Sequence, residues 1–240
     1  RDYKIRGVVN GIDVDVFNPA TDKNLVANYT LKTVAKRAEN KKALCELMGF
    51  NYSPDRPLMV LISRLTEQKG IDLVATVLDE MLQADIQLVV LGKGDWKYET
   101  ILKNAEKTYN TKMRAIINFS QELASKLYGA ADMFLMPSKF EPCGLGQMIA
   151  MRYGAVPIVR ETGGLKDTVE AFNPVTQKGN GFTFKSYNAH DMLGAIRRSL
   201  GAYSDKKYWA SLVERALECD NSWGRSAREY MRLYRETIGK

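Results

Sequence analysis

From residue 57 onward the sequence alternates short apolar runs with amphipathic stretches, and this alternation constrains the fold more than any other feature. The apolar runs are residues 58–62, 86–91, 113–117, 133–136, 155–159 and 181–184. Continuous apolar runs of this length are typical of strands covered on both faces. Helical patterns follow them near residues 71–82, 96–109 and 122–130, from 145, and from 165. This alternation predicts an α/β fold with a Rossmann-like, doubly wound parallel sheet of about six strands.

The beginning of the chain departs from this alternation. Residues 5–13 read as a short strand that ends in an Asn-Gly turn, and residues 14–33 read as a polar loop. Residues 34–48 have the pattern of an amphipathic helix, which Gly49 is expected to stop. Because the chain begins at Arg1 and a predicted strand follows almost at once, we interpret it as a piece of a longer protein.

The end of the chain is predicted to be helical only. The expected helices cover residues 189–202, 206–218 and 222–238. Ser222 is a good N-cap candidate for the last of them. We therefore divide the chain into a domain of residues 1–221 and a C-terminal helix of residues 222–240, which we expect to pack on another domain.

Composition narrows the classes of function. The chain has 240 residues, of which 45% are hydrophobic, enough for one α/β domain. Its net charge of +7 is compatible with anionic ligands, but no dense run of Lys and Arg with interleaved aromatics predicts nucleic-acid binding. Cys45, Cys143 and Cys219 lack metal-ligand spacing, and His190 is the only histidine, so we expect no metal site. The sequence has no apolar run long enough to span a bilayer, so we expect no membrane partner.

A carboxylate follows the apolar run at residues 133–136. Ligands of doubly wound sheets bind beyond the carboxyl ends of the strands, so the loops after the strands are where a site is expected. Glu141 lies in such a loop, and Gly144 and Gly146 after it allow close approach of backbone and ligand. The carboxylate could hold sugar hydroxyls. The alternative is that Glu141 is only a charge near a helix start and that the glycines only make a turn.

Two cations follow the buried strand predicted at residues 58–62. Arg64 and Lys69 lie in the loop of residues 63–70, before the next helix. A transferase that breaks a sugar–phosphate bond must stabilise negative charge on the leaving diphosphate, and Arg with Lys can do so without a metal. The alternative is a solvated basic loop.

Three further loops carry weaker signals. One is Gly92-Lys93-Gly94, which alone reads more readily as a tight turn than as a phosphate loop. Another contains Asn118 and Phe119, where the aromatic ring could close the core instead of contacting a ligand. The third is Thr162-Gly163-Gly164-Leu165, which could equally be a helix cap with glycines for close packing.

Taken in order, these loops resemble the donor-site motifs of bacterial glycogen synthases and plant starch synthases, which are retaining glucosyltransferases of the GT-B fold. The resemblance rests on Ser-Arg-Leu-x-x-Gln-Lys-Gly, Glu-Pro-Cys-Gly-Leu-x-Gln and Thr-Gly-Gly-Leu-x-Asp-Thr-Val, with a Gly-x-Gly segment between the first two. It covers essentially the whole chain. Many retaining GT-B enzymes carry a second Glu eight positions after the first, where this chain has Ile149. The glycogen and starch synthases generally lack that Glu, so the difference favours this branch.

The resemblance implies a role for each matching residue. Arg64 and Lys69 would bind the nucleotide phosphates, and Glu141 would hold the hydroxyls of the donor glucose; these three are the candidate catalytic residues. Phe119 matches an aromatic that stacks on the base. The remaining candidate donor-binding residues are Asn10, Asn118, Cys143, Gly144, Leu145, Gly146, Gly163 and Gly164. Gly146 stands where many relatives have Thr or Asn, which removes one side-chain contact.

The implied function is that of the donor-binding half of an ADP-glucose-dependent α-1,4-glucan synthase. Such an enzyme transfers glucose to the non-reducing end of an α-glucan with retention of configuration, with ADP-glucose as donor and no cofactor or metal. The acceptor would bind through an amino-terminal domain absent from this chain, so the chain alone is expected to be inactive. The resemblance implies a cytoplasmic enzyme if the source is bacterial and a plastid enzyme if it is a plant. The alternatives are another GT-B glycosyltransferase, sucrose-forming or UDP-sugar dependent, or a nucleotide-binding module without activity.

Overall fold

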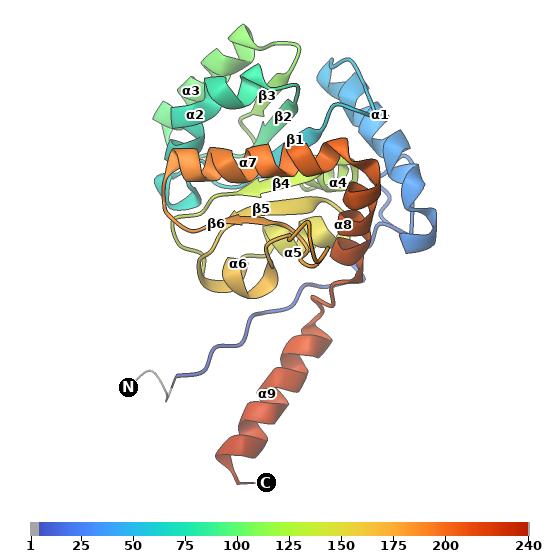
Figure 1. Ribbon diagram of the computed structural model, residues 1–240, viewed down its shortest axis with the longest axis vertical. Helices are drawn as coiled ribbons and strands as arrows, with labels where there is room; N and C mark the ends of the chain where they lie inside the picture. Colours follow the sequence, from blue (N-terminus) through green and yellow to red (C-terminus); the bar gives the residue numbers. More distant parts are fainter. Residues whose placement is uncertain (1–4, 240) are drawn as a thin grey trace.

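The computed structural model describes residues 5–239, so residues 1–4 and residue 240, the two ends of the predicted domain division, lie outside the described part. In it, six parallel strands form one sheet (Figure 1). They are β1 (Leu58–Ile62), β2 (Gln87–Leu91), β3 (Met113–Ile116), β4 (Met133–Met136), β5 (Val156–Arg160) and β6 (Phe182–Phe184). Their order in the sheet is β3-β2-β1-β4-β5-β6, which confirms the predicted doubly wound α/β fold.

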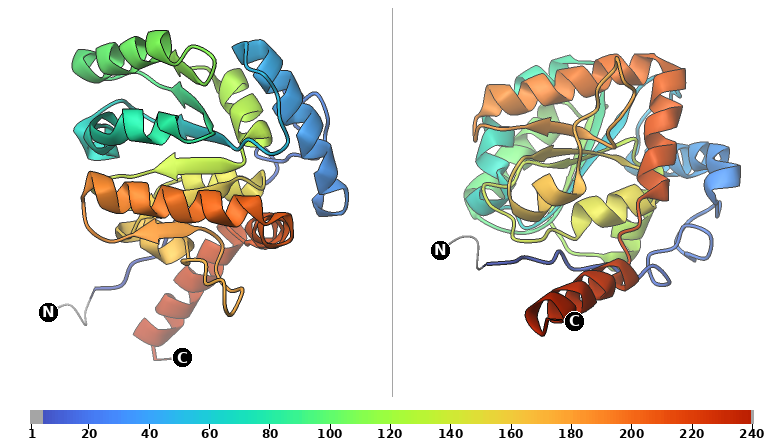
Figure 2. Two further views of the ribbon diagram at one scale, coloured as in Figure 1. Left: turned by 45° about the horizontal axis from the view of Figure 1, so that its top comes forward. Right: turned by 60° about the horizontal axis from the view of Figure 1, so that its bottom comes forward.

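Helices cover both faces of this sheet (Figure 2). One face packs against α2 (Ile71–Gln83), α3 (Trp96–Thr108) and α7 (Ala189–Ser204). The other packs against α1 (Arg37–Met48), α4 (Gln121–Ala130), α5 (Gly146–Arg152) and α6 (Gly163–Thr168). Helix α8 (Lys206–Glu218) contributes buried residues to both layers, and α9 (Trp223–Thr237) extends away from the body of the domain.

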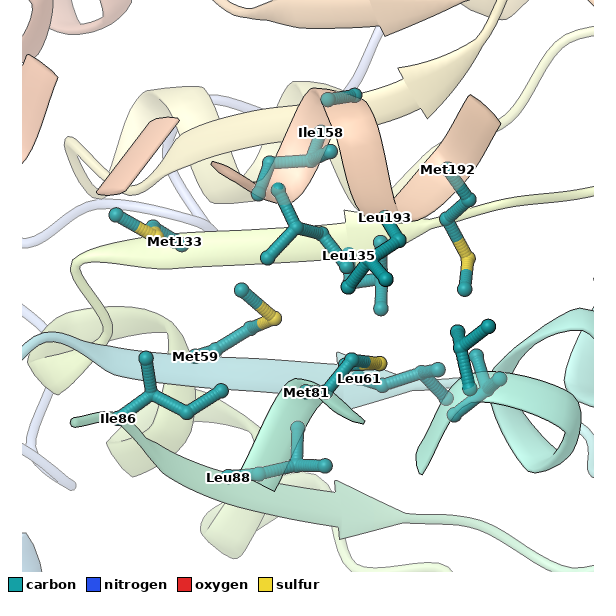
Figure 3. Packing of buried hydrophobic residues seen from close by; sticks show 14 of the residues in the cluster. Met59, Leu61, Met81, Ile86, Leu88, Met133, Leu135, Ile158, Met192 and Leu193 are labelled. Carbon is teal, nitrogen blue, oxygen red and sulfur yellow. The ribbon is translucent and has the colours of Figure 1, made fainter. Parts of the chain in front are cut away.

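The strands are apolar on both faces because both faces are buried. Successive side chains of a strand point to opposite faces. In β1, Met59 and Leu61 belong to the core under α2 and α7, whereas Leu58 and Val60 belong to the core under α1 and α4. Figure 3 shows the first of these cores, where Met59 and Leu61 lie near Met81 of α2. This two-sided burial is the physical reason why the strands read as continuous apolar runs.

Local signals place several helix ends where the sequence predicts them. Gly49 ends α1 in the left-handed conformation, with φ of 66°. The Ser222 hydroxyl accepts a hydrogen bond from the backbone N–H of Arg225, so Ser222 is the N-cap of α9, as predicted.

The segment before α1 differs from its prediction. Residues 5–13 form no strand; Ile12 makes an isolated bridge to Ser222, and its N–H donates to the carbonyl oxygen of Asn221 at 2.8 Å. This segment runs past the start of α9 instead of joining the sheet, although Ile12 is buried in the core layer under α1 and α4 and Val9 packs against that layer. The expected loop of residues 14–33 also runs into a 3₁₀ helix, η2 (Leu31–Lys36).

Several helix starts also shift by one to three residues. Helix α1 begins at Arg37 instead of Val34, because η2 occupies the preceding residues and Thr33 within it has non-helical angles. Helix α5 begins at Gly146 and α6 at Gly163, where the sequence predicts starts at residues 145 and 165. Glu141 lies five residues before α5 and outside its first turn.

Candidate functional site

Two loops meet at the carboxyl ends of β1 and β4, where the strand order of the sheet reverses. In doubly wound sheets ligands bind at this point. The β1 loop (residues 63–70) and the β4 loop (residues 137–145) touch through Gly70, whose φ is 75° and where an added Cβ would lie 2.2 Å from the Pro137 carbonyl oxygen. The backbone N–H of Lys139 donates to the carbonyl oxygen of Gln68 at 2.9 Å. The adjacency of β1 and β4 therefore brings the two sequence-predicted loops together.

Lys69 and Glu141 face each other across these loops. Lys69 Nζ lies 2.5 Å from Glu141 Oε2, and the two side chains are 15% and 10% exposed. The hydroxyl of Ser138, a fully buried residue, donates to the same carboxylate oxygen at 3.2 Å. In the described part of the chain, no donor bonds Glu141 Oε1, and Lys69 Nζ uses one of its three hydrogens. The pair therefore keeps hydrogen-bonding capacity on both partners.

Ser138 is a site residue that the sequence analysis missed. It lies three residues before Glu141 and two after the end of β4. A small polar residue directly after a buried strand, inside the matched loop, is the signal that could have found it.

Arg64 lies on the same loop as Lys69 but is exposed. Its Nη2 donates to Gln68 Oε1 at 3.2 Å. A guanidinium has five N–H donors, so most of its donors stay open to a ligand. The predicted roles of Arg64 and Lys69 toward phosphate stay predictions, and their common loop is compatible with both.

A second ion pair joins the two loops on the surface. Lys139 Nζ of the β4 loop donates to Glu67 Oε1 of the β1 loop at 2.6 Å. The hydrogen bond from Lys139 lowers the pKa of the Glu67 carboxyl, and the same bond raises the pKa of Lys139. Both groups are exposed, so the pair adds little stability on its own.

Glycines bring a third segment against the β4 loop. An added Cβ on Gly163 would lie 2.2 Å from the Glu141 carbonyl oxygen, and one on Gly164 would lie 2.0 Å from the Cys143 carbonyl oxygen. The N–H of Gly164 donates to the carbonyl oxygens of Glu141 and Pro142, at 3.1 Å and 3.2 Å. These two glycines therefore pack the start of α6 onto the loop that carries Glu141.

The turn between β4 and α5 is held by Gln147, a second residue that the sequence analysis did not single out. Gln147 is fully buried, and its Nε2 donates to the Gly144 carbonyl oxygen at 2.8 Å and to Thr168 Oγ1 at 3.0 Å. Gly144 itself has φ of 75°, which other residues rarely adopt. Leu145 is half exposed, and Gly146 begins α5. The fixed place of a Gln in the matched motif is the signal that points to this role.

Asn10 and Cys143 lie next to each other. The Sγ of Cys143 is 4.0 Å from the carbonyl oxygen of Asn10, and the Asn10 side chain is exposed. Ser226 Oγ donates to the carbonyl oxygen of Val9 at 2.8 Å, which holds this part of the amino-terminal segment against α9. The candidate residue most distant in sequence from Glu141 is thus brought to the β4 loop.

Phe119 lies farther away, because its strand β3 is separated from β1 by β2. Its ring is 73% exposed and Asn118 is exposed beside it, so the alternative that Phe119 closes the core is wrong. The loop after β2 (residues 92–95) packs against the β1 loop. The N–H of Leu65 donates to the Lys93 carbonyl oxygen at 2.8 Å, and an added Cβ on Gly94 would lie 2.2 Å from the Leu65 carbonyl oxygen. Gly94 therefore serves close packing on the β1 loop.

Two further findings concern metal binding and membrane-spanning helices. Within residues 5–239, no three or more His, Cys, Asp or Glu side chains gather where they could hold a metal ion. None of the described helices is both long and apolar enough to cross a membrane. The metal independence expected from the sequence stays a prediction.

A six-stranded parallel sheet in the order 3-2-1-4-5-6, with polar loops at the reversal of strand order, defines a Rossmann-like α/β domain. The family model "Glycosyl transferases group 1" matches residues 50–216, and the chain belongs to this family.

The similar proteins narrow the class. The chain is 52% identical to a glycogen synthase of Clostridium acetobutylicum over 239 residues, which is 99% of this chain and 50% of the relative. It is 49% identical to a glycogen synthase of Clostridium perfringens, over 99% of this chain and 49% of the relative. The chain thus spans about half the length of the curated relatives it matches.

Solved structures agree with this placement. The catalytic domain of Starch Synthase IV from Arabidopsis thaliana, bound to ADP and acarbose, superposes with a TM-score of 0.90 at 37% identity, over all of this chain and 50% of that one. A sucrose-phosphate synthase from Thermosynechococcus elongatus superposes with a TM-score of 0.66 at 21% identity over 98% of this chain and 53% of that one, which shows the fold alone.

Proposed function

We propose that this chain is the donor-binding half of an α-1,4-glucan synthase that transfers glucose from ADP-glucose to the non-reducing end of an α-glucan. The observation that carries the proposal is the Lys69–Glu141 pair, at 2.5 Å, at the carboxyl ends of β1 and β4. A cation suited to a diphosphate and a carboxylate suited to sugar hydroxyls stand side by side there. The similarity to glycogen synthases over nearly the whole chain supports it.

In the proposed reaction, the bond between the anomeric carbon of glucose and the diphosphate oxygen breaks. The hydroxyl oxygen of the acceptor bonds the anomeric carbon on the face that the diphosphate leaves, so the configuration is retained. The proton of that hydroxyl passes to an oxygen of the leaving phosphate, and ADP departs. Lys69 and Arg64 stabilise the negative charge that develops on the diphosphate, and Glu141 holds the glucose hydroxyls in place.

The acceptor side of the proposal lies in an amino-terminal half that this chain does not contain. Helix α9 supports a contact with such a half, because Trp223 and Tyr234 are 50% and 60% exposed and Ser226 is its only buried residue among those described. We propose that residues 222–240 pack on the amino-terminal half. Slower amide hydrogen exchange of α9 in the full-length protein than in the chain alone would support this packing, and equal exchange would contradict it.

The donor chemistry needs no cofactor in this proposal, because Arg64 and Lys69 supply positive charge to the phosphates. Full activity after treatment with EDTA is the expected result. By the same proposal the enzyme works in the cytoplasm of a bacterium or in a plant plastid, according to its source.

A transfer assay tests the proposed function. We expect the full-length protein to move glucose from ADP-glucose to glycogen with an α-linked product, and we expect the chain alone to bind ADP weakly and transfer none. Titration of ADP and UDP by calorimetry should show tighter binding of ADP. Absence of transfer by the full-length protein would contradict the proposal, and robust elongation by the chain alone would contradict the need for a second half.

A further inference from the structure

An arginine at the end of β5 is bonded to the backbone of the β4 loop. Arg160 is the last residue of β5, and its Nε donates to the Ser138 carbonyl oxygen at 3.0 Å. Its Nη2 donates to the carbonyl oxygen of Lys139, and its Nη1 to that of Lys185 at 3.3 Å. Each of its three nitrogens therefore faces a main-chain carbonyl, and two of these carbonyls lie just before Glu141. A lysine in its place could not reproduce this planar fork.

A tyrosine after β6 is bonded to the other loop. The hydroxyl of Tyr187 shares its one hydrogen between Asp72 Oδ1, at 2.5 Å, and the carbonyl oxygen of Glu67 in the β1 loop, at 2.9 Å. Burial, together with the bond to Asp72, raises the pKa of this hydroxyl far above its usual value, so it remains a donor. Tyr187 thus fixes the β1 loop just before Lys69.

These two residues also contact each other. The guanidinium of Arg160 lies 5.6 Å from the centre of the Tyr187 ring, within the range of a cation–π contact. The ammonium of Lys139 lies 5.4 Å from the same ring. Arg160, Tyr187 and Lys139 therefore form one cluster that connects the ends of β5 and β6 with both site loops.

We propose that Arg160 and Tyr187 are positioning residues that hold the β1 and β4 loops in register, so that Lys69 and Glu141 face the donor together. This inference rests on the function proposed above. Neither side chain needs to touch the donor for this role, because its polar atoms face the backbone of the loops or Asp72. A small displacement of Glu141 relative to the phosphate-binding cations is enough to reduce turnover, since misplacement by about 1 Å can cost about 10²-fold in rate.

The first test is Arg160→Gln in the full-length enzyme, with Arg197→Gln as the matched control. Arg197 is an exposed arginine of α7 whose Nη2 lies 3.5 Å from Glu80, away from both loops. We expect kcat to fall by about 10- to 100-fold in Arg160→Gln, with a much smaller change in KM for the donor and a melting temperature close to that of the control. Unchanged kcat would overturn the proposal.

The conservative variant separates geometry from charge. Arg160→Lys keeps the positive charge but loses the fork, so we expect it to restore only part of kcat. Full restoration by Lys would show that charge near the site is what counts, and it would overturn the positioning role. Tyr187→Phe removes only a hydroxyl and should lower kcat by about fivefold, the loss that corresponds to its neutral hydrogen bond with the Glu67 carbonyl oxygen of the loop. Its control is Tyr208→Phe on α8.

Amide hydrogen exchange tests the same idea without activity. In Arg160→Gln we expect faster exchange of the Lys139 amide, which donates to Gln68, and unchanged exchange in β1 and β4. If the wild-type enzyme proves inactive with ADP-glucose but this exchange change occurs, the proposed function fails and the link between the loops stands. If the wild type is active and Arg160→Gln matches Arg197→Gln in both readouts, the positioning role is wrong.

Discussion

Two lysine–carboxylate pairs lie at opposite ends of the strands, and they differ in how many hydrogens of the lysine have a partner. At the amino ends of the strands, Lys41 Nζ lies 2.8 Å from Asp132 Oδ2. The same ammonium donates to the Arg56 carbonyl oxygen at 2.7 Å and to the Tyr203 hydroxyl at 3.0 Å. All three of its hydrogens therefore have a partner.

The carboxylate of this pair is held through one of its oxygens. Asp132 Oδ2 accepts from the N–H of Leu58, the first residue of β1, at 2.8 Å. Burial raises the pKa of the nearby Tyr203 hydroxyl, and the charge of Asp132 raises it further, so the hydroxyl stays protonated. The side chains of Lys41 and Asp132 are 6% and 12% exposed. Lys41 therefore has no hydrogen left for a ligand, and this pair joins the amino ends of β1 and β4.

The pair at the carboxyl ends of the strands is similar in burial, but its lysine has fewer hydrogen-bond partners. Lys69 and Glu141 are almost as buried, but among the described residues Lys69 Nζ has Glu141 as its sole partner. Burial of charges without full hydrogen bonding is costly, and proteins keep such arrangements mainly at functional sites. The hydrogen-bond partners of the lysine therefore distinguish the structural ion pair from the candidate binding pair, whereas burial does not.

The largest effect is expected from breaking the structural pair. Asp132→Ala leaves the Lys41 ammonium buried without its carboxylate, and removing one partner of a buried pair costs about 3–5 kcal/mol in the free energy of unfolding. Urea unfolding followed by circular dichroism measures this loss. Glu141→Ala is the matched variant at the carboxyl ends of the strands. Because Lys69 keeps access to water there, we expect a clearly smaller loss in the free energy of unfolding. Equal losses for the two variants would remove the distinction between the pairs.

The next effect concerns turnover, which we expect to depend on the Lys69–Glu141 pair. Glu141→Gln in the full-length enzyme should lower kcat by about 10²-fold or more, because the carboxylate orients the glucose ring against the departing phosphate. The circular dichroism spectrum should stay that of the wild type, since a loop residue carries little of the core. Unfolding of this variant would make the effect structural and would leave the assignment of Glu141 without support.

The two cations of the β1 loop come third. Lys69→Ala or Arg64→Ala should each lower kcat/KM by about 10²-fold, the scale for removing a preorganised donor that stabilises developing charge. Lys103→Ala, which removes an exposed cation of α3 paired with Glu106, serves as the control. Near-normal kcat/KM in either loop variant would return this loop to the alternative of a solvated basic segment.

The smallest effect is expected at the neighbour of Glu141. Cys143→Ser should leave substantial activity, with at most a few-fold change in kcat, because a thiol is a weak donor and the side chain offers only a small apolar surface. Steady-state kinetics of Cys143→Ser and Glu141→Gln under the same conditions give the comparison. A Cys143→Ser enzyme as inactive as Glu141→Gln, with its fold intact, would show that this ranking is wrong.

Much of the fold can be predicted from the sequence, because the local hydrophobic pattern indicates which residues form buried strands and which form helices. The apolar run at residues 133–136 predicts a buried strand without knowledge of its neighbours, and β4 covers those residues. The loops with Arg64, Lys69 and Glu141 were also found, since they directly follow such strands and their residue types suit a sugar diphosphate. An ambiguous local pattern gives a wrong prediction at residues 5–13, which have the pattern of a strand but pair with no strand of the sheet.

Tertiary structure alone decided which distant residues share a site. Lys69 and Glu141 are 72 residues apart, and they meet because β1 and β4 pair across the reversal of strand order. No sequence pattern links Arg160 to the carbonyl oxygen of Ser138 either, since that bond depends on β5 lying beside β4. Side-chain periodicity reports the burial of a residue within its own element, whereas the partner across the sheet is set by the packing of the whole domain.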